Sequence, residues 1–187
     1  MIRLFSYVVD HDEGFAPHPN GRYCTLAWCK YKRKHCSPRN IVELAKEGDW
    51  VVGTGGTSRK SAGRGKLIYA MRVDKKVPLV EYRKVKRFAK RLDAVPDPVR
   101  KDQCVLISQH FFYFGAAAVP IPPRFRSYPL ETKRGFRYKN FTDDFISDFV
   151  AWLEGESEVG VNGKPCKPVP DFSTSRCPTT ARRKVCP

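Results

Sequence analysis

Hydrophobic and polar positions alternate with a period of two in parts of the chain, which predicts β-strands. Residues 67–73 alternate in this way, and residues 2–9 form a short run of β-branched and aromatic side chains. Similar runs predict further strands at 23–28, 49–54, 104–108 and 111–114. The last two are either separate strands or one strand with a kink.

Two segments show a helical period instead. Residues 79–92 place apolar side chains at i, i+3, i+4 and i+7, which predicts one buried helix face. That face comprises Val85, Phe88, Ala89 and Leu92. Thr142 is expected to cap a second amphipathic helix. Its apolar side chains are Ile146, Phe149, Val150 and Leu153. Asn40 is expected to cap a short helix at 41–46.

The order of these elements sets the fold class. Strands and helices do not alternate as βαβα, so a doubly wound parallel sheet is not expected. The pattern predicts an α+β fold with a mixed, mostly antiparallel sheet or a small β-barrel, and two or three packed helices. Residues 1–159 are expected to form a single domain. Residues 160–187 have few large apolar residues and many prolines, threonines and basic residues, and we expect a poorly ordered tail.

The charge of the chain changes the picture. The 187 residues include 35 basic and 19 acidic side chains, which gives a net charge of +16. A charge of this size opposes compaction, so a polyanionic partner is expected, with nucleic acid, above all DNA, as the leading candidate. The alternatives are a solvated basic surface and anionic lipid. No apolar run approaches the roughly 20 residues of a membrane-spanning helix, so no membrane association is expected.

Two segments concentrate the basic residues. Six of the nine residues in 83–91 are basic, and residues 30–39 contain five more. Side chains spaced in this way neutralise phosphates, which favours a grip on the nucleic-acid backbone over the reading of base edges. A solvated helix face is the alternative for each segment.

The N-terminus and the cysteines bear on the compartment. The apolar segment 2–9 is short for a signal peptide, and acidic residues follow it directly. We therefore expect a cytoplasmic protein. The seven cysteines are widely scattered and are expected to be thiols in that reducing compartment.

Cysteine and histidine side chains near residue 30 offer two kinds of chemistry. Zinc ligands of the right types are Cys24, Cys29, His35 and Cys36. Their Cys-x4-Cys and Cys-x6-Cys spacings lack a matching second pair, so no cofactor is predicted and zinc is a minor alternative. Nucleophilic catalysis by Cys24 would need a base and a carboxylate. The candidates are His11 or His18, and Asp10 or Asp12. A buried structural cysteine is the commoner explanation of Cys24.

The glycines at 53, 55 and 56 follow a predicted strand and could offer backbone amides to a phosphate. The segment lacks the Lys-Ser/Thr ending of a P-loop and the third glycine of a dinucleotide-binding fingerprint. ATP and NAD binding are therefore unsupported, and a tight turn is the alternative explanation.

An ordered set of motifs resembles a known family. The set begins with Phe5-Ser6-Tyr7-Val8-Val9, Gly14-Phe15-Ala16-Pro17 and Cys24-Thr25-Leu26-Ala27-x-Cys29-Lys30. It continues with 48–55, 67–73, 105–108 and 112–115. Over roughly residues 1–155 this set resembles nucleotide-modification-associated domain 2. The resemblance implies an association with enzymes that modify DNA bases in phages and bacteria. The stretch between Tyr82 and Val105 departs from that family because it is short and basic.

A second, shorter layout is similar to PUA-like domains, including the EVE-type domains that bind modified bases. It consists of a basic helix, a Gly-Asp-x-Val-x-Gly turn, a polar loop and a strand. This resemblance implies a pocket for a flipped-out base, with Tyr7, Trp50 and Tyr113 as stacking candidates. The predicted nucleic-acid-binding and base-binding residues are Tyr7, Thr25, Lys30, Arg39, Trp50, Gly53, Gly55, Arg83, Lys84, Arg87, Arg91 and Tyr113.

Three functional hypotheses follow. The favoured one is a nucleic-acid-binding protein associated with DNA base modification, recognising DNA or a modified base. The second is an enzyme of the same pathway. The third is an accessory protein that binds DNA-modifying enzymes and has no pocket of its own.

Overall fold

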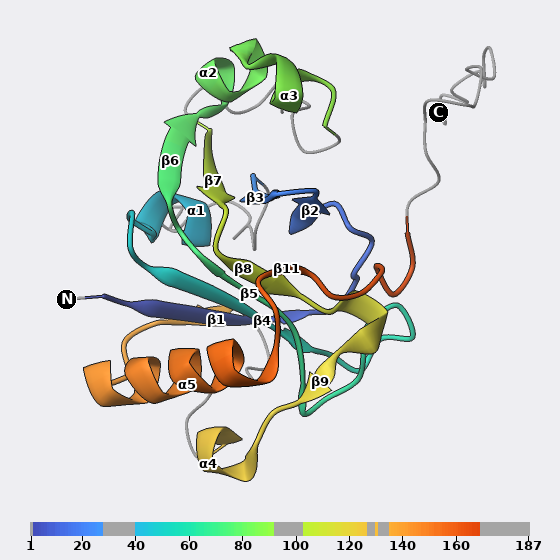
Figure 1. Ribbon diagram of the computed structural model, residues 1–187, viewed down its shortest axis with the longest axis vertical. Coiled ribbons are helices and arrows are strands. Elements are labelled where there is room, and N and C mark those ends of the chain that lie inside the picture. The colour runs from blue at the N-terminus through green and yellow to red at the C-terminus, as the bar shows by residue number, and fades with distance from the viewer. Residues whose placement is uncertain (1, 28–39, 92–102, 127–129, 131–134, 169–187) are drawn as a thin grey trace, which may run out of the picture.

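The computed structural model describes residues 2–27, 40–91, 103–126, 130 and 135–168, which form two β-sheets and five α-helices (Figure 1). The larger sheet has the order β10-β1-β4-β5-β8-β11, and β9 also pairs with β5. Its strands are β1 (Leu4–Val9), β4 (Trp50–Gly55), β5 (Lys66–Arg72), β8 (Phe111–Tyr113), β9 (Val119–Pro120), β10 (Phe136–Arg137) and β11 (Gly160–Val161). The β1–β4 and β8–β11 pairs are parallel and the other pairs are antiparallel.

The smaller sheet is antiparallel throughout and has the order β2-β3-β7-β6. Its strands are β2 (His18–Asn20), β3 (Tyr23–Leu26), β6 (Lys75–Pro78) and β7 (Cys104–Ser108). The helices are α1 (Ile41–Leu44), α2 (Leu79–Lys84), α3 (Lys86–Ala89), α4 (Pro123–Arg126) and α5 (Asp143–Glu156). The α+β class with mostly antiparallel pairing is confirmed, and the described strands form two open sheets in place of a small barrel.

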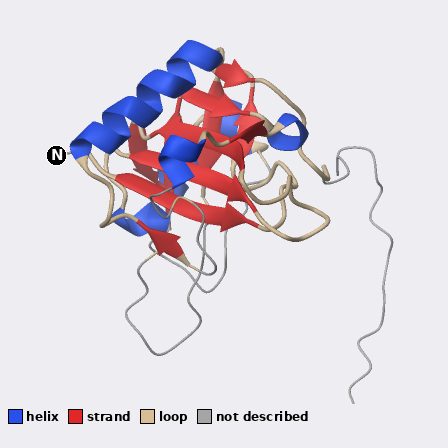
Figure 2. Cartoon of the chain, turned by 90° about the horizontal axis from the view of Figure 1, so that it is seen from below, coloured by secondary structure: helices blue, strands red, loops and turns tan. Residues whose placement is uncertain are grey.

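Three apolar clusters hold these layers together. The first lies between the sheets and includes Phe5, Tyr69 and Leu106. The second lies between the larger sheet and the helices α4 and α5 (Figure 2). The third joins the outer face of the smaller sheet to α2 and α3. Because the larger sheet is covered on both faces, β1 and β4 are buried along their whole length, and neither shows an alternation of buried and exposed positions.

Asp74 fixes the corner where the chain passes between the sheets. Strand β5 leads into β6 of the other sheet, and β7 leads back into β8 through Gln109 and His110. The Asp74 carboxylate accepts hydrogen bonds from the backbone N–H groups of Gln109 (2.6 Å) and His110 (3.3 Å). It also pairs with Arg72 at 2.9 Å. The kink predicted between 104 and 114 is therefore a change of sheet.

The capping predictions for α1 and α5 are confirmed. The Asn40 side chain accepts a hydrogen bond from the Glu43 N–H at 2.8 Å, and the Glu43 carboxylate accepts one from the Asn40 N–H. Thr142 Oγ1 accepts a hydrogen bond from the Phe145 N–H at 3.2 Å. The α5 side chains Ile146, Phe149 and Leu153 are buried as their period predicts.

The single helical region predicted over 79–92 is wrong. Val85 has extended backbone angles (φ −79°, ψ 114°) and separates α2 from α3. Its side chain is 42% exposed and Ala89 is also exposed, whereas Leu79, Tyr82 and Phe88 are buried. The break rotates α3 relative to α2, so no continuous stripe runs through both helices. Leu92 lies outside the described residues.

Several short strands carry no readable sequence pattern. Residues 18–20, predicted as a loop, form β2 on the edge of the smaller sheet, where Pro19 needs no ladder donor. Residues 160–168, which the sequence analysis assigned to the tail, pack on the domain. Gly160–Val161 pairs with β8, and the Lys167 N–H donates to the Asp12 carbonyl at 2.9 Å.

Candidate functional site

The helices α2 and α3 lie at one end of the molecule (Figure 1), and their exposed side chains form a basic face. We define it by five exposed side chains, Arg83, Lys84, Lys86, Arg87 and Lys90. Glu81 is the only acidic residue of α2 and α3, and it pairs with Lys84 at 2.7 Å. The predicted phosphate-binding residues Arg83, Lys84 and Arg87 are all exposed on these two helices, as are Lys86 and Lys90.

Apolar packing on the smaller sheet positions this basic face. Tyr82 and Phe88 stack with ring centroids 4.7 Å apart, and both are buried against β3 and β7. Tyr23 of β3 meets the edge of Phe88, and its hydroxyl accepts a hydrogen bond from Arg87 Nη1 at 2.6 Å. Arg87 is thus held in place by the fold. The exposed lysines Lys86 and Lys90 present solvated ammonium groups, which suit phosphate contact.

Arg91 does not belong to the basic face, although the sequence placed it there. Its side chain is 8% exposed, and Nη2 donates to the carbonyl of His18 on β2. The guanidinium also lies over the Phe88 ring, 5.7 Å from the centroid. Arg91 thus links α3 to the edge strand β2 of the smaller sheet and holds α3 in position.

Other predicted residues lie outside the part of the chain that the structure describes. Lys30 and Arg39 of the second basic segment belong to this group. So do Cys29, His35 and Cys36, so the minor alternative of a zinc site with Cys24 also falls outside the described residues. Among the described residues, no group of three or more His, Cys, Asp or Glu side chains has the arrangement of a metal site.

A buried carboxylate lies at the edge of the inter-sheet core. Asp12 is 1% exposed, and Oδ1 accepts a hydrogen bond from the Tyr113 hydroxyl at 2.6 Å. Oδ2 accepts one from the backbone N–H of Cys166 at 2.9 Å. The thiol of Cys166 also hydrogen-bonds this carboxylate, and the buried Cys24 belongs to the same apolar cluster as Tyr113. We call these four residues (Asp12, Cys24, Tyr113 and Cys166) the Asp12 cluster.

The Asp12 cluster keeps its neutral donors protonated. Burial, followed by the charge and the hydrogen bond of Asp12, raises the pKa of the Tyr113 hydroxyl far above its usual range. Burial and then the same carboxylate raise the pKa of the Cys166 thiol to about 11. Because the pKa of the Cys166 thiol is higher in the folded chain than in the unfolded chain, its protonation contributes to the free energy of unfolding. This contribution is complete below the unfolded thiol pKa and is lost as pH rises toward 11.

A segment from the end of the domain closes over the cluster. In this strap, residues 160–167, the Asn162 N–H donates to the Tyr113 carbonyl at 2.7 Å. The carbonyl of Lys164 accepts a hydrogen bond from the Ala116 N–H, also at 2.7 Å. Pro165 packs directly on Gly14 in the loop between β1 and β2, which contains Asp12 and is called the Asp12 loop. The strap and the Asp12 loop therefore cover one end of the space between the sheets.

Two tyrosines predicted to stack on a base are buried, and Tyr113 contacts both the strap and Asp12. Tyr113 is fully buried, and Tyr7 is buried with its hydroxyl 2.8 Å from that of Tyr69. Thr25 is also buried and accepts a hydrogen bond from the Tyr82 hydroxyl at 3.2 Å. Contact between a base and any of these side chains would need the covering segments to move. Their role in base recognition stays a prediction.

The structure separates the candidates for catalysis with Cys24. His18 is buried on β2, which pairs with the Cys24 strand β3, and Asp12 belongs to the Asp12 cluster. The Cys24 side chain is fully buried, whereas His11 is exposed and Asp10 is half-buried beside Gly56. The carboxylate that meets the interior is Asp12, one of the two that the sequence offered. Its partner Tyr113 was expected to stack on a base, and no local pattern marks it as a hydrogen-bond donor to Asp12.

The glycines have packing roles in this structure. Gly53 lies beneath the ring of Tyr69, which leaves no room for a Cβ atom, and Gly55 lies against the backbone of Gly63. A side chain at either position would collide with these neighbours. Trp50, also predicted to stack on a base, lies on the opposite face of the larger sheet against α5.

The Asp12 cluster is expected to slow the alkylation of Cys166. The rate of alkylation by iodoacetamide follows the thiolate fraction, so Cys166 should react more slowly at pH 9 than it does in the urea-unfolded chain. Asp12→Asn should raise the rate, because removal of the negative charge lowers the thiol pKa. Mass spectrometry of the Cys166 peptide measures both rates. Equal rates in the folded chain, the variant and the unfolded chain would contradict the assignment.

Fold and surface together define an α+β domain with a basic exterior face and a polar cluster closed off inside. The chain matches the family model described as nucleotide modification associated domain 2 over residues 1–103 and 97–172, and it belongs to that family. The comparison with curated proteins finds no match. No solved structure matches either. No helix of the described residues is long and apolar enough to cross a membrane.

Proposed function

We propose that the protein binds DNA as a component of a nucleotide-modification system and grips the phosphate backbone with its basic face. The observation that carries this proposal is the set of five exposed basic side chains on α2 and α3, with Arg87 held in place by Tyr23. Membership of a nucleotide-modification family and the net charge of +16 support it. We place this activity in the cytoplasm, the reducing compartment in which widely scattered cysteines are expected as thiols.

This grip is expected to tolerate many sequences. The basic face offers ammonium and guanidinium groups, which bind phosphates without reading base edges. The aromatic side chains suited to stacking, Tyr7 and Tyr113, are buried inside the domain. We therefore assign the main binding free energy to the basic face. Selection of a modified base would require the cluster to open.

The enzyme hypothesis has weaker support. Nucleophilic catalysis needs an accessible thiolate beside a base. Cys24 is fully buried, and of the two predicted bases His11 lies on the surface while His18 is buried on β2. The accessory role is compatible with DNA binding and is taken up below.

Fluorescence anisotropy with matched oligonucleotides tests the proposal. The set contains single-stranded and double-stranded DNA, plain and base-modified, together with RNA of the same sequence. Duplex DNA should bind with an affinity that falls about 10²–10³-fold between 50 and 200 mM salt, as expected for roughly five phosphate contacts. Plain and modified duplexes should bind within about threefold of each other, since phosphate contacts carry no base information.

Two results would contradict the proposal. The first is the absence of DNA binding at 50 mM salt. The second is strong preference for one modified base with little salt dependence, which would move recognition from the basic face to the buried tyrosines. Tighter binding of RNA than of DNA would still support phosphate contact by the basic face, but it would identify RNA and not DNA as the ligand.

A further inference from the structure

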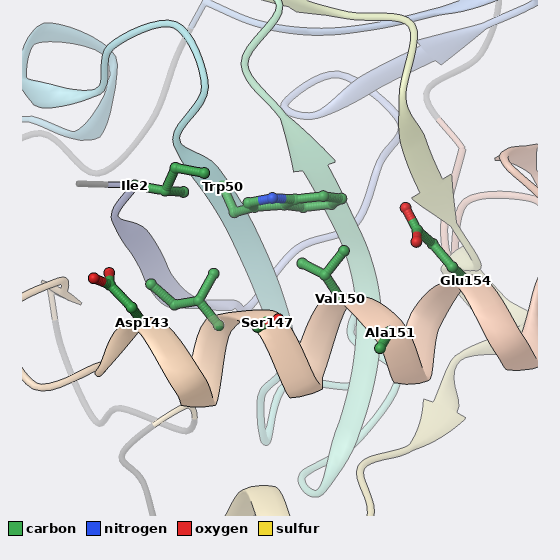
Figure 3. A pocket seen from close by; sticks show the side chains of 8 residues that line it. Ile2, Trp50, Asp143, Ser147, Val150, Ala151 and Glu154 are labelled. Atoms are coloured by element: carbon green, nitrogen blue, oxygen red, sulfur yellow. The ribbon is translucent and has the colours of Figure 1, made fainter.

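A groove lies between the larger sheet and α5, on the side of the domain away from the basic face (Figures 1 and 3). Its volume is about 560 Å³. Trp50 of β4 forms one wall and is 4% exposed, so its ring is a fixed surface and does not protrude. Val150 and Ala151 of α5 line the opposite wall. The 51% exposed side chain of Ile2 borders the groove and adds apolar surface.

Carboxylates stand at both ends of this groove. Asp143 lies at the start of α5 and Glu154 near its end (Figure 3). They are eleven residues apart, or about 16 Å along the helix axis. Glu154 Oε1 is 3.0 Å from His110 Nε2, but the two atoms are not aligned as a hydrogen bond, and the Glu154 side chain stays 48% exposed. Both carboxylates are therefore accessible to a ligand in the groove.

The charge of α5 is opposite to that of the chain. The helix has five acidic residues and no basic one, and six of the 19 acidic residues of the chain lie between Asp143 and Glu158. Asp143 and Asp144 stabilise the positive N-terminal end of the helix. Glu154 and Glu156 lie at the negative C-terminal end, where the macrodipole disfavours them. Helix stability therefore does not account for the acidic residues at that end.

We propose that this groove binds a basic segment of a partner protein that carries an apolar anchor side chain. The anchor packs between Trp50 and the aliphatic wall of α5. Lysine or arginine side chains on either side of it pair with Asp143 and Glu154. Charge complementarity selects this occupant over nucleic acid, because the acidic residues that flank the groove repel phosphates.

The length and position of the groove fit such a partner. About 16 Å corresponds to roughly three turns of helix, enough for one anchor with a basic residue a turn or more away on each side. The two sheets separate α5 from α2 and α3. A basic protein segment and nucleic acid can therefore bind the same molecule together. The inference does not depend on the nucleic-acid proposal, since the two surfaces share no residue.

Two designed peptides test the groove by isothermal titration calorimetry with the full chain. Both have 14 residues and a leucine stripe at helical spacing, and the remaining positions are lysine in one and glutamate in the other. The net charge of +16 by itself favours the glutamate peptide. Only the groove favours the lysine peptide, which should bind about 10-fold more tightly than the glutamate peptide.

A matched pair of variants locates the binding. Ala151→Arg places a positive side chain in the groove at an exposed helix position and should weaken the lysine peptide about 10-fold. Ala116→Arg adds the same charge at an exposed position outside the groove and should leave the affinity unchanged. Circular dichroism confirms that both variants fold.

Three results would overturn the inference. The lysine peptide does not bind the wild-type chain, the glutamate peptide binds as tightly as the lysine peptide, or the two variants bind the lysine peptide equally. The duplex oligonucleotide is titrated separately into Ala151→Arg and should bind as it does to wild type. A marked change there would assign the groove to nucleic acid. Loss of oligonucleotide binding to the wild type with lysine-peptide binding retained would overturn only the nucleic-acid proposal.

Discussion

Replacement of Arg83, Lys86, Arg87 and Lys90 by glutamine is expected to lower the affinity for duplex DNA about 100-fold at 50 mM salt. Each of these side chains is exposed on α2 or α3, so each is free to neutralise a phosphate and release its counterion. Glutamine keeps a polar side chain of moderate length and removes the positive charge. Anisotropy titration of one labelled duplex measures the change.

A second variant controls for the loss of net charge. Arg59, Arg64, Lys139 and Lys164 are also exposed, but they lie outside α2 and α3. Their replacement by glutamine also removes two arginines and two lysines, so the net charge changes by the same amount. The affinity should fall less than about fivefold, through the weaker long-range field alone. An equal loss in both variants would mean that total charge, and not the basic face, binds DNA. Thermal melting shows whether the loss of the Arg87–Tyr23 hydrogen bond alters stability.

Gly53→Ala is expected to destabilise the domain by about 3 kcal/mol. A methyl group at this position meets ring carbons of Tyr69 and a methyl group of Val9 at less than contact distance. The Tyr69 ring is fully buried and its hydroxyl is engaged with Tyr7, so it has no room to move away. Urea unfolding followed by tryptophan fluorescence measures the loss.

Gly155→Ala is the matched control for that substitution. Gly155 lies in α5 near its end, and a methyl group there meets no atom within 4 Å. Alanine is the better helix former, so this variant should be more stable than wild type by about 0.5–1 kcal/mol. Equal stability of Gly53→Ala and wild type would contradict the close packing of Tyr69 over β4.

The sequence predicts the parts of the fold whose signals are local. Thr142, the two aspartates after it and an apolar period of 3.6 define α5 and its buried face, because all of this information lies within one helix. The capping residue Asn40 specifies α1 in the same way. The strands β1, β4 and β5 are long enough for their β-branched composition to be read.

Long-range packing decides the parts that the sequence does not predict. The apolar period over 79–92 has the right composition, but Tyr82 and Phe88 stack on each other and break the helix at Val85. Strands β10 and β11 have two residues each, too few for any period. They exist because a distant strand offers them a free edge.

The candidate site divides in the same way. The basic face was predictable because its charge lies in one stretch of sequence, although Arg91 is turned inward by the carbonyl of His18. The Asp12 cluster was not predictable, since the backbone of Cys166 reaches Asp12 across 154 residues. Asp10 and Asp12 are equivalent in sequence, and only the returning strap selects Asp12.

The salt dependence of DNA binding tests the central claim most directly. The slope of log K against log salt concentration counts the phosphates that are neutralised, at about 0.9 for each contact with duplex DNA. The variant of Arg83, Lys86, Arg87 and Lys90 should have a slope about 3–4 units shallower than wild type, while the control variant keeps the wild-type slope. Equal slopes for all three proteins would contradict the assignment of the basic face as the nucleic-acid interface.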